Sequence, residues 1–321
     1  MTEVQQRLEE TNSVLGTAEP FVSVIVPVYN DADRLKKCLA ALEQQTYHPG
    51  CFEVIVVDNG SDPDQNVNDC AAKFDHVIVT HESLPSSYAA RNKGISVAKG
   101  EILAFTDADC IPANDWLEKG IKYLVENPNC GSVGGRIQLF LVNPGKVTPV
   151  DLYDQVVFGF PQEDLIKRNG GIITANLLTR KSVIEHVGGF CSSLKSFGDQ
   201  EWGMRVKAAG YEQLYASDAR VFHPTRSSLE DLLQRQTRYA GGLYDCYIRS
   251  ETSLWVRNRR FVRFIVSYLL LFNFDWVKRV LTDPRLEDNK TRFKVFTLAA
   301  RLQLASALEI VRLKFGGASK R

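Results

Sequence analysis

The sequence predicts an α/β fold in which a mostly parallel sheet is flanked by helices and followed by a basic helical extension. Short apolar, β-branched runs alternate with amphipathic stretches between residues 21 and 221, and this alternation is typical of parallel strands joined by crossover helices. The chain of 321 residues is long enough for one large domain and an appendage. We therefore expect a flexible lead-in at 1–20, a main domain at 21–248 and a basic amphipathic helical extension at 249–321.

Charge is distributed unevenly along the chain. The formal net charge is only +1, yet residues 249–321 hold 16 Lys and Arg against 6 Asp and Glu, and the first 248 residues hold 23 against 32. The seven cysteines are scattered, which predicts reduced thiols in a cytoplasmic protein. The polar first twenty residues do not resemble a signal peptide, and no apolar run reaches the ~18 residues that a membrane-spanning helix needs.

The elements are expected in alternating order. The run FVSVIVPV at 21–28 predicts the first strand, and a helix capped by Asp31 or Asp33 follows it. Another helix begins at Ser86 or Ser87 and ends at Gly100. Further strands are expected at 53–57, 76–79, 102–105, 131–142, 172–179 with Asn176 at its centre, and 213–221, and further helices at 114–126, 151–160, 181–187 and from about 199 to Gly210.

Two carboxylates, Asp107 and Asp109, follow directly after the buried strand 102–105. Residues i and i+2 of an extended chain point to the same side, and open α/β sheets bind ligands at the carboxyl ends of their strands. Such a pair suits a hard divalent cation that takes its other ligands from water and phosphate. The alternative is a loop with two solvated acids, and an Asp-x-Asp motif without supporting context favours this alternative.

Two common nucleotide-binding motifs are missing from the sequence. No G-x-G-x-x-G follows the first strand, which argues against a dinucleotide dehydrogenase. No G-x-x-x-x-G-K-[ST] occurs, which argues against a P-loop enzyme.

Five segments in a fixed order resemble the family 2 glycosyltransferases, which have the GT-A fold. They read SVIVPVYN, VIVVDNGS, AARNKGISVAKGEILAFTDAD, GGF and FGDQEWGMRVKAAGY, and the resemblance covers residues 21–223. The blocks SYAARNKG and FGDQEW look most like bacterial enzymes that build cell-surface polysaccharides. The resemblance implies an inverting, metal-dependent transferase that moves a sugar from a nucleotide sugar, with UDP as the expected nucleotide, to a saccharide or lipid-linked acceptor.

The resemblance also implies a donor site. Asp58 would hydrogen-bond the uracil, and Arg91 would lie against the base or the diphosphate. The first acid of the Asp-x-Asp motif would contact ribose or metal, and the second would hold Mn²⁺ or Mg²⁺ on the diphosphate. The residues expected to bind the nucleotide sugar are Pro27, Val28, Tyr29, Asn30, Asp58, Arg91, Asp107 and Asp109.

Inverting transfer needs a base that removes the proton from the acceptor hydroxyl. Asp199 matches the catalytic acid of the family's Glu-Asp motif, although Gly198 replaces the Glu, and Glu201 is the fallback base. A carboxylate at a helix start is stabilised in its ionised form, which would make Asp199 a weaker base. A structural role as an N-cap is the alternative for Asp199.

Three downstream residues have both functional and structural interpretations. His223 would complete the metal site together with Asp107 and Asp109, or it is a surface histidine fixed by Pro224. Arg235 and Arg238 lie in a segment similar to the Q-x-x-R-W signature of processive synthases, but with Arg for Gln and Tyr for Trp, so we do not expect processivity. The two arginines would clamp a diphosphate or an anionic acceptor, or form a solvated basic face.

The apolar and basic stretches at 261–272 and 293–315 predict amphipathic helices in the extension. These helices would pack on the catalytic domain, pair in a homodimer, or lie as a peripheral anchor on the cytoplasmic face of the membrane. Nucleic acid is not an expected partner, because no groove-like module of basic and aromatic residues occurs.

Two other functions compete with sugar transfer. A nucleotidyltransferase acting on a sugar phosphate would need a Gly-rich phosphate loop after the first strand, and VPVYNDADR is not such a loop. A non-catalytic GT-A scaffold would have no need to keep Asp58, Asp107, Asp109 and Asp199 together.

Overall fold

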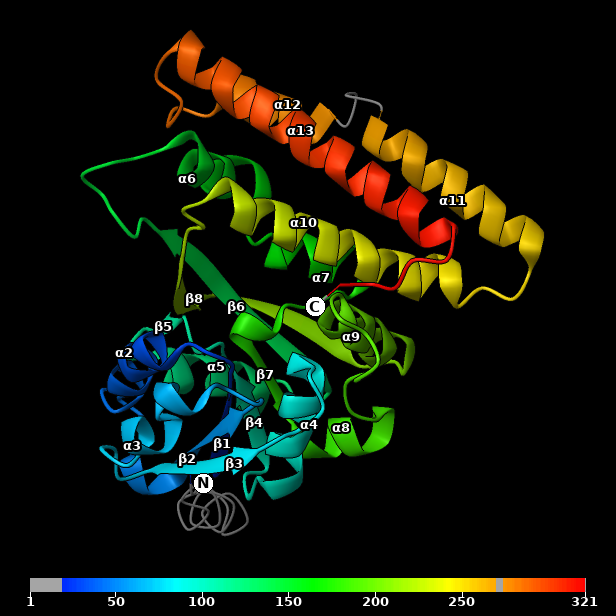
Figure 1. The fold of residues 1–321 in the computed structure, drawn as a ribbon. Helices are drawn as coiled ribbons and strands as arrows, with labels where there is room; N and C mark the ends of the chain where they lie inside the picture. The colour runs from blue at the N-terminus through cyan, green and yellow to red at the C-terminus, as the bar shows by residue number, and fades with distance from the viewer. Residues whose placement is uncertain (1–18, 270–273, 321) are drawn as a thin grey trace, which may run out of the picture.

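An eight-stranded mixed sheet forms the centre of the molecule, with helices on both faces and a layer of long helices above one end (Figure 1). The structure is a computed structural model that describes residues 19–269 and 274–320. The strand order is β3-β2-β1-β4-β7-β6-β8-β5. The expected lead-in at 1–20 falls almost entirely outside the described residues.

Four parallel strands make up the first half of the sheet: β1 (Val22–Val28), β2 (Phe52–Asp58), β3 (Val77–His81) and β4 (Ile102–Phe105). Side chains alternate across β1. Val22, Val24 and Val26 pack against α2 (Ala32–Leu42), α3 (Val67–Ala71) and α5 (Trp116–Glu126), whereas Ile25 packs against α4 (Ser87–Val97), α8 (Lys181–Val187) and α9 (Gly198–Ala208). Both faces are covered, as the continuous apolar runs predict.

In the second half of the sheet, two strands run against the direction of β1 to β4 and the other two keep it. β7 (Leu177–Arg180) runs antiparallel between β4 and β6 (Cys130–Phe140), and β8 (Glu212–Pro224) is parallel to β6. The two-residue strand β5 (Ile111–Pro112) closes this edge, antiparallel to β8. The mostly parallel α/β sheet flanked by helices is confirmed, and the Asp-x-Asp motif follows β4, one of the strands that share the common direction.

Several expected boundaries were wrong. Asn176 does not lie within a strand at 172–179 but in a 3₁₀ turn (Thr174–Asn176) before β7. Its buried side chain accepts a hydrogen bond from the Trp116 indole at 2.8 Å and donates to the carbonyls of Arg136 and Ala219 at 3.0 Å each. The turn is therefore held by tertiary contacts rather than by β propensity.

Four further differences concern three helical segments and one strand. The segment expected as one helix at 151–160 is α6 (Pro149–Tyr153) followed by a π-helical turn (Asp154–Phe158). α7 (Gln162–Asn169) was not expected at all, and α4 ends before Ala98 rather than at Gly100. β8 extends beyond residue 221, so His223 lies within the strand rather than after it.

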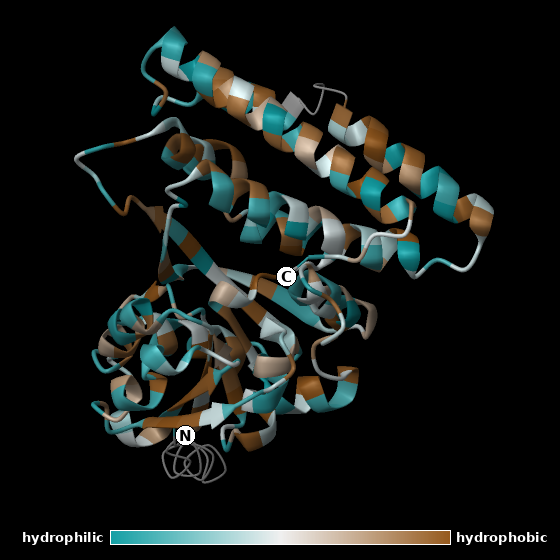
Figure 2. Cartoon of the chain, viewed as in Figure 1, coloured by the Kyte–Doolittle hydropathy of each residue, from teal (hydrophilic) through white to brown (hydrophobic). Residues whose placement is uncertain are grey.

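Helices α10 (Leu229–Tyr244), α11 (Leu254–Leu269), α12 (Phe274–Thr282) and α13 (Asn289–Lys314) form the upper layer, and a π-helical turn (Asp245–Arg249) follows α10. α13 contacts α10 and α6. Val295, Leu298 and Leu302 are buried in one apolar cluster with Tyr153 and Leu232. Hydrophobic and hydrophilic residues alternate along α13 (Figure 2). α13 thus packs on the body of the protein. The expected domain boundary between residues 248 and 249 stays a prediction.

Within 19–269 and 274–320, every helix is too short or too polar to cross a bilayer. The apolar stretch expected at 261–272 belongs to α11 up to Leu269, and its last residues lie outside the described part of the chain.

Candidate active site

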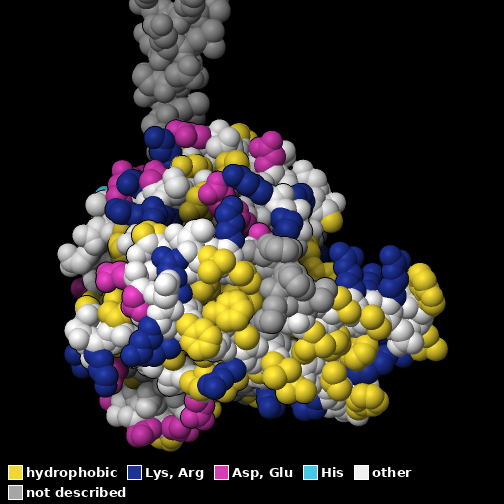
Figure 3. Space-filling view, turned by 90° about the horizontal axis from the view of Figure 1, so that it is seen from above, with side chains coloured by type: hydrophobic (Ala, Val, Ile, Leu, Met, Phe, Trp, Pro, Cys, Tyr) yellow, Lys and Arg dark blue, Asp and Glu magenta, His cyan; other side chains and the backbone are white. Residues whose placement is uncertain are grey.

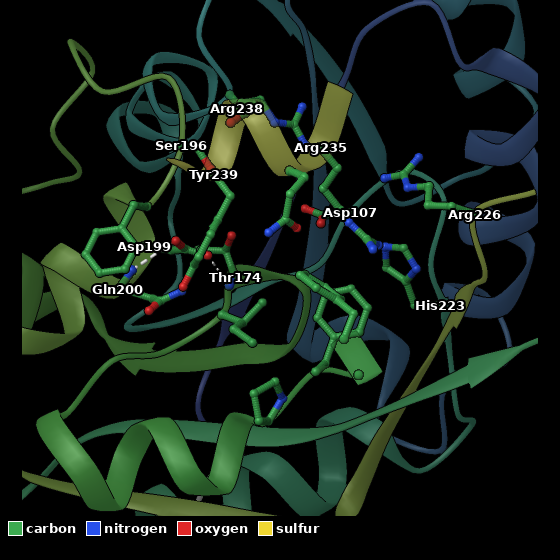
Figure 4. Close-up of a pocket in the computed structure, with 18 of the residues that line it drawn as sticks. Asp107, Thr174, Ser196, Asp199, Gln200, His223, Arg226, Arg235, Arg238 and Tyr239 are labelled. Carbon is green, nitrogen blue, oxygen red and sulfur yellow. Dashed lines mark hydrogen bonds between the residues drawn. The ribbon is translucent and has the colours of Figure 1, made fainter. Parts of the chain in front are cut away.

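A cavity of about 690 Å³ opens at the carboxyl ends of β1 and β4. Its walls come from the loops after these strands, from α4, from the start of α9 and from α10 (Figure 4). Helices α11, α12 and α13 add Tyr268, Trp276, Arg279 and Gln303 to the lining. The sheet and the C-terminal helices therefore share one cavity.

The Asp-x-Asp motif forms part of a compact group of potential metal ligands. One ligand atom from each of Asp107, Asp109, Cys110 and His223 lies within 4.8 Å of the others. Burial, with the nearby charges of Asp109 and Asp107, holds the pKa of the Cys110 thiol well above its usual range. Thiolates suit soft metals, whereas the two carboxylates and the imidazole are the donors that suit a hard or borderline divalent cation.

His223 is oriented as a metal ligand would be. Its Nδ1 lies 2.7 Å from the Pro224 carbonyl oxygen, which accepts a hydrogen bond from the ring and leaves Nε2 facing Asp109 Oδ1 at 3.6 Å. A backbone partner on one ring nitrogen commonly fixes the tautomer of a ligating histidine. The residues present thus fit a divalent cation, and the buried position of His223 excludes the surface histidine that the sequence left open.

Arginines neutralise both carboxylates of the motif. Arg91 Nη2 lies 2.5 Å from Asp107 Oδ1, and Arg34 Nη1 lies 3.7 Å from Asp109 Oδ2. Burial would raise the pKa of Asp109, but His223, Arg226 and Arg34 together hold it below its ordinary value. Asp109 is therefore ionised at neutral pH and ready to accept a cation.

Asp199 lies in the first turn of α9, and its side chain is directed into the cavity (Figure 4). Its Oδ1 accepts hydrogen bonds from the Gln200 N–H at 2.9 Å and the Tyr88 hydroxyl at 3.2 Å, and Oδ2 accepts one from the Thr174 N–H at 3.4 Å. Burial raises the pKa of Asp199, while Arg91 and the backbone N–H groups offset only part of this. The expected weakening by the helix start is thus outweighed by desolvation, and Asp199 is a stronger base than an ordinary Asp.

Gly198 is required by the packing of Tyr88. A Cβ atom at position 198 would lie 2.8 Å from the Tyr88 ring, closer than real contacts allow. The residue before it, Phe197, has a left-handed φ of 69° and is buried. The departure from the family's Glu-Asp pair therefore coincides with an aromatic ring that fills the space of the missing side chain.

Glu201, the fallback base, is engaged elsewhere. Its carboxylate forms a bidentate pair with Arg205, at 2.7 Å and 3.1 Å, and it does not line the cavity. Asp199 is the carboxylate of this segment that reaches the cavity.

The arginines of α10 line the same cavity, so the solvated basic face is wrong. Arg235 is buried, pairs with Asp154 at 2.5 Å and lies over the Phe158 ring at 3.7 Å. Burial lowers the pKa of Arg238, and neighbouring Arg226 and Arg235 lower it further. Figure 4 shows these guanidinium groups around Asp107.

The residues expected to bind the nucleobase are divided between two places. Pro27, Val28 and Tyr29 line the main cavity. Asn30 and Asp58 do not. Asn30 donates to Asp62 at 2.8 Å, and Asp58 accepts from the Ser61 N–H at 2.9 Å and lines a second, smaller pocket. Contact of these two residues with a base stays a prediction.

Sequence reasoning did not single out Tyr88, Thr174 or Arg226. Tyr88 lies one helical turn before Arg91 on α4, and this spacing was the one available signal. Thr174 acts through its backbone N–H and Arg226 lies in a loop before α10, so neither carries a sequence pattern.

Comparison with known proteins agrees with this geometry. The model of glycosyl transferase family 2 matches residues 23–188, and that of glycosyl transferase family group 2 matches residues 106–298. The chain belongs to glycosyltransferase family 2. The glycosyltransferase AglE of Haloferax volcanii is 38% identical over 238 residues, an alignment that covers 73% of this chain and 77% of AglE.

Two more distant proteins extend the comparison. A pre-mycofactocin glycosyltransferase of Mycobacterium tuberculosis is 27% identical over 73% of this chain, but the alignment covers only 49% of the mycobacterial protein. A mannosyltransferase of Pyrobaculum calidifontis, solved with GDP-Man and Mn²⁺, superposes with a TM-score of 0.63 at 20% identity, over 93% of this chain and 89% of the solved one. That likeness establishes the GT-A fold for this family 2 chain.

Proposed function

We propose that this family 2 glycosyltransferase inverts the anomeric centre and uses a divalent cation to move a sugar from a UDP-linked donor to a saccharide or lipid-linked acceptor of a surface polysaccharide. One observation carries the proposal. Asp199 lies on one side of a single cavity, His223 on the other, and Asp107 between them (Figure 4). A base and a cation site that face each other across one cavity match the two groups that inverting transfer requires.

The role of Asp199 follows from its surroundings. Its carboxylate would accept the proton of the acceptor hydroxyl as that oxygen attacks the anomeric carbon from the face opposite the diphosphate. Burial raises the pKa of Asp199, and a base with a raised pKa takes up this proton more readily. The carboxylate must be ionised to act, so transfer falls as the pH drops through this raised pKa.

The cation would be held by Asp107, Asp109 and Nε2 of His223. The mixed oxygen and nitrogen donors suit Mn²⁺ and also accept Mg²⁺. When bound, the cation neutralises the charge that develops on the leaving nucleoside diphosphate. Arg91 supports the site from α4, since it orients Asp107 and places a fixed positive charge beside the diphosphate.

The donor is proposed to be UDP-linked because of the family match at Asp58, and a GDP-linked sugar is the second candidate. The solved mannosyltransferase was bound to GDP-Man. Uracil presents one N–H to a carboxylate, whereas guanine presents two. Asp58 Oδ1 already accepts the Ser61 N–H. A direct donor comparison therefore decides between the two nucleotides.

The other two functions are less well supported. Nucleotidyl transfer would need a phosphate loop after β1, but Asn30 instead bonds Ser61 and Asp62, and the Ala32 N–H donates to the Gln65 side chain. A binding scaffold would gain nothing from the energetic cost of a buried Asp199. The seven free thiols are consistent with a cytoplasmic location, and homodimerisation is a separate open proposal.

The test is a thermal-shift screen of purified protein with UDP- and GDP-linked sugars in the presence of Mn²⁺. A ligand at about 100 times its dissociation constant stabilises the folded state by roughly 2.7 kcal/mol. We expect stabilisation by a UDP-sugar that needs Mn²⁺ and is lost in Asp109→Asn. Asp199→Asn should retain it. Stabilisation by GDP-sugars only would show that the donor is GDP-linked rather than UDP-linked. No stabilisation by any donor would contradict the proposed function.

A further inference from the structure

Helix α11 has two different apolar faces. Phe261, Phe264, Ile265 and Tyr268 pack against the cluster formed by α10 and the end of α13. A second stripe points outward, where Trp255 is 68% exposed, Val262 56%, Val266 44% and Leu269 53%. The spacing of seven, four and three residues places this stripe along one line of the helix. Soluble surfaces rarely leave such a line of large apolar side chains uncovered.

The charges beside this stripe all have one sign. α11 contains Arg257, Arg259, Arg260 and Arg263 and not a single Asp or Glu. Arg259 and Arg263 are exposed next to the stripe, and Arg259 lies over the Trp255 ring at 5.5 Å. Neither has an acidic partner among residues 19–269 and 274–320, whereas Arg260 pairs with Glu251. Figure 3 shows apolar and basic side chains together on the part of this face where α11 lies.

We propose that the outer face of α11, which comprises Trp255, Arg259, Val262, Arg263, Val266 and Leu269, binds the surface of an anionic lipid bilayer. An interfacial helix combines these same features: an apolar stripe that enters the acyl boundary, a Trp at the headgroup level, and arginines that meet anionic headgroups. The proposal assigns membrane contact to α11 and packing to α13, two roles that the amphipathic pattern does not separate.

A second copy of the chain is a poorer occupant of this face. A two-fold contact would bring Arg259 and Arg263 of both copies into one interface. α11 has no carboxylate to neutralise them, so the charges would repel each other. An anionic bilayer provides the opposite charge over the whole face.

The position of α11 links this face to the cavity. Tyr268 of α11 and the neighbouring Trp276 and Arg279 of α12 line the same cavity as Asp199. A helix that lies in the bilayer surface would hold this end of the cavity beside the headgroups, where an acceptor with a lipid tail presents its polar end. Only the advantage for a lipid-linked acceptor depends on the proposed function, because binding of α11 to lipid does not require sugar transfer.

The test is flotation of the full chain with vesicles of phosphatidylcholine alone or mixed with phosphatidylglycerol, without donor or acceptor. We expect binding to the anionic vesicles that weakens with salt. Trp255 provides a second readout, because Trp116 and Trp202 are fully buried and Trp276 is 6% exposed. Its emission should shift to the blue and be quenched by brominated lipid.

Matched surface variants show whether vesicle binding depends on this face of α11 or is non-specific adsorption. Val262→Gln/Val266→Gln and Arg259→Gln/Arg263→Gln should each weaken binding to anionic vesicles by about tenfold or more. Ile78→Gln/Val125→Gln and Lys37→Gln/Lys73→Gln change exposed residues of the sheet region and should leave binding unchanged. Failure to bind anionic vesicles, or equal binding by all variants, would overturn the proposal. So would a dimer in gel filtration that the α11 variants dissociate, because a second copy would then cover the face.

Discussion

Tyr88 is the residue whose contribution to Asp199 is easiest to isolate. Its hydroxyl donates to Asp199 Oδ1 at 3.2 Å, and its ring rests against Gly198. The remaining donors to Asp199 are backbone N–H groups, which substitution cannot remove. Tyr88 therefore acts as a positioning residue, because it orients the carboxylate without needing to touch the acceptor.

Tyr88→Phe should lower the plateau kcat by about tenfold, since a misoriented base loses part of the gain from general base catalysis. The acid limb of the pH profile should move to higher pH, because the ionised carboxylate loses a donor and its pKa rises. Donor KM should stay the same. Tyr123→Phe is the matched control, as Tyr123 donates to Asp218 at 3.0 Å far from the cavity. An unchanged pH profile in Tyr88→Phe would contradict the role of Tyr88 as a positioning residue for Asp199.

The start of α9 is held in place by α10. Gly242 of α10 packs so closely that an added Cβ would lie 2.4 Å from the Ser196 carbonyl oxygen. Phe197, next in the chain, contacts the rings of Tyr239 and Tyr247. Ser196 and Phe197, directly before α9, are thus held in place by α10 and by the π-helical turn that follows it.

Gly242→Ala should reduce kcat by about tenfold or more, because the clash displaces Ser196 and Phe197 and with them the first turn of α9, which carries Asp199, and shifts of 1 Å are costly at such sites. Gly241→Ala is the control on the same helix, since its Cβ would meet only the Ser319 side chain, at 3.3 Å. Both changes raise helix propensity by up to ~1 kcal/mol. Steady-state kinetics and Tm of the two variants, measured together, distinguish displacement of Asp199 from a loss of stability of the whole protein. Equal kcat values for the two variants would contradict the role of α10 in positioning Asp199.

Elements with local signals were predictable, and those set by distant contacts were not. Ser86 or Ser87 was expected to begin α4, and the Ser86 hydroxyl accepts a hydrogen bond from the Ala89 N–H at 3.4 Å as the N-cap. Strand 102–105 was predicted to the residue. Asn176 was misplaced because Trp116, Arg136 and Ala219 hold its turn, and these residues are far away in the sequence. The contact between Tyr88 and Gly198 was missed for the same reason.

For the molecule as a whole, Asp199 carries a cost in stability. Its pKa is raised in the folded state, so its contribution to stability is greatest below the unfolded pKa and is lost as the pH rises through the folded pKa. The function of the base therefore opposes the stability of the fold at neutral pH.

Asp199→Asn should consequently raise Tm at pH 7 by on the order of a few degrees, because the amide avoids burying a charge. The gain should shrink as the pH falls through the raised pKa of Asp199, because the wild-type carboxyl then becomes protonated. Asp64→Asn, at an exposed position, serves as the control. A variant that is less stable than the wild type at pH 7 would show that the ionised carboxylate is fully compensated by its hydrogen bonds.

The arrangement of the C-terminal helices was the least predictable feature at this scale. Amphipathic periodicity identifies which side of a helix is apolar but not what covers it. Leu298 and Leu302 of α13 are buried, whereas Val262 and Val266 of α11 are exposed, although both pairs lie in similar basic, apolar segments. The cluster of potential metal ligands was more predictable, since the carboxyl ends of parallel strands lie at one edge of the sheet and the family motif specified Asp107 and Asp109.

The central claim is that Asp199 and the Asp107–Asp109 pair act together in metal-dependent sugar transfer. The most direct measurement is release of nucleoside diphosphate from a panel of nucleotide sugars with candidate acceptors and Mn²⁺, by wild type and Asp199→Asn side by side. We predict acceptor-dependent release by the wild type, its loss on chelation, and a decrease of at least about 10³-fold in Asp199→Asn with donor binding intact. Turnover by Asp199→Asn close to that of the wild type would contradict the account.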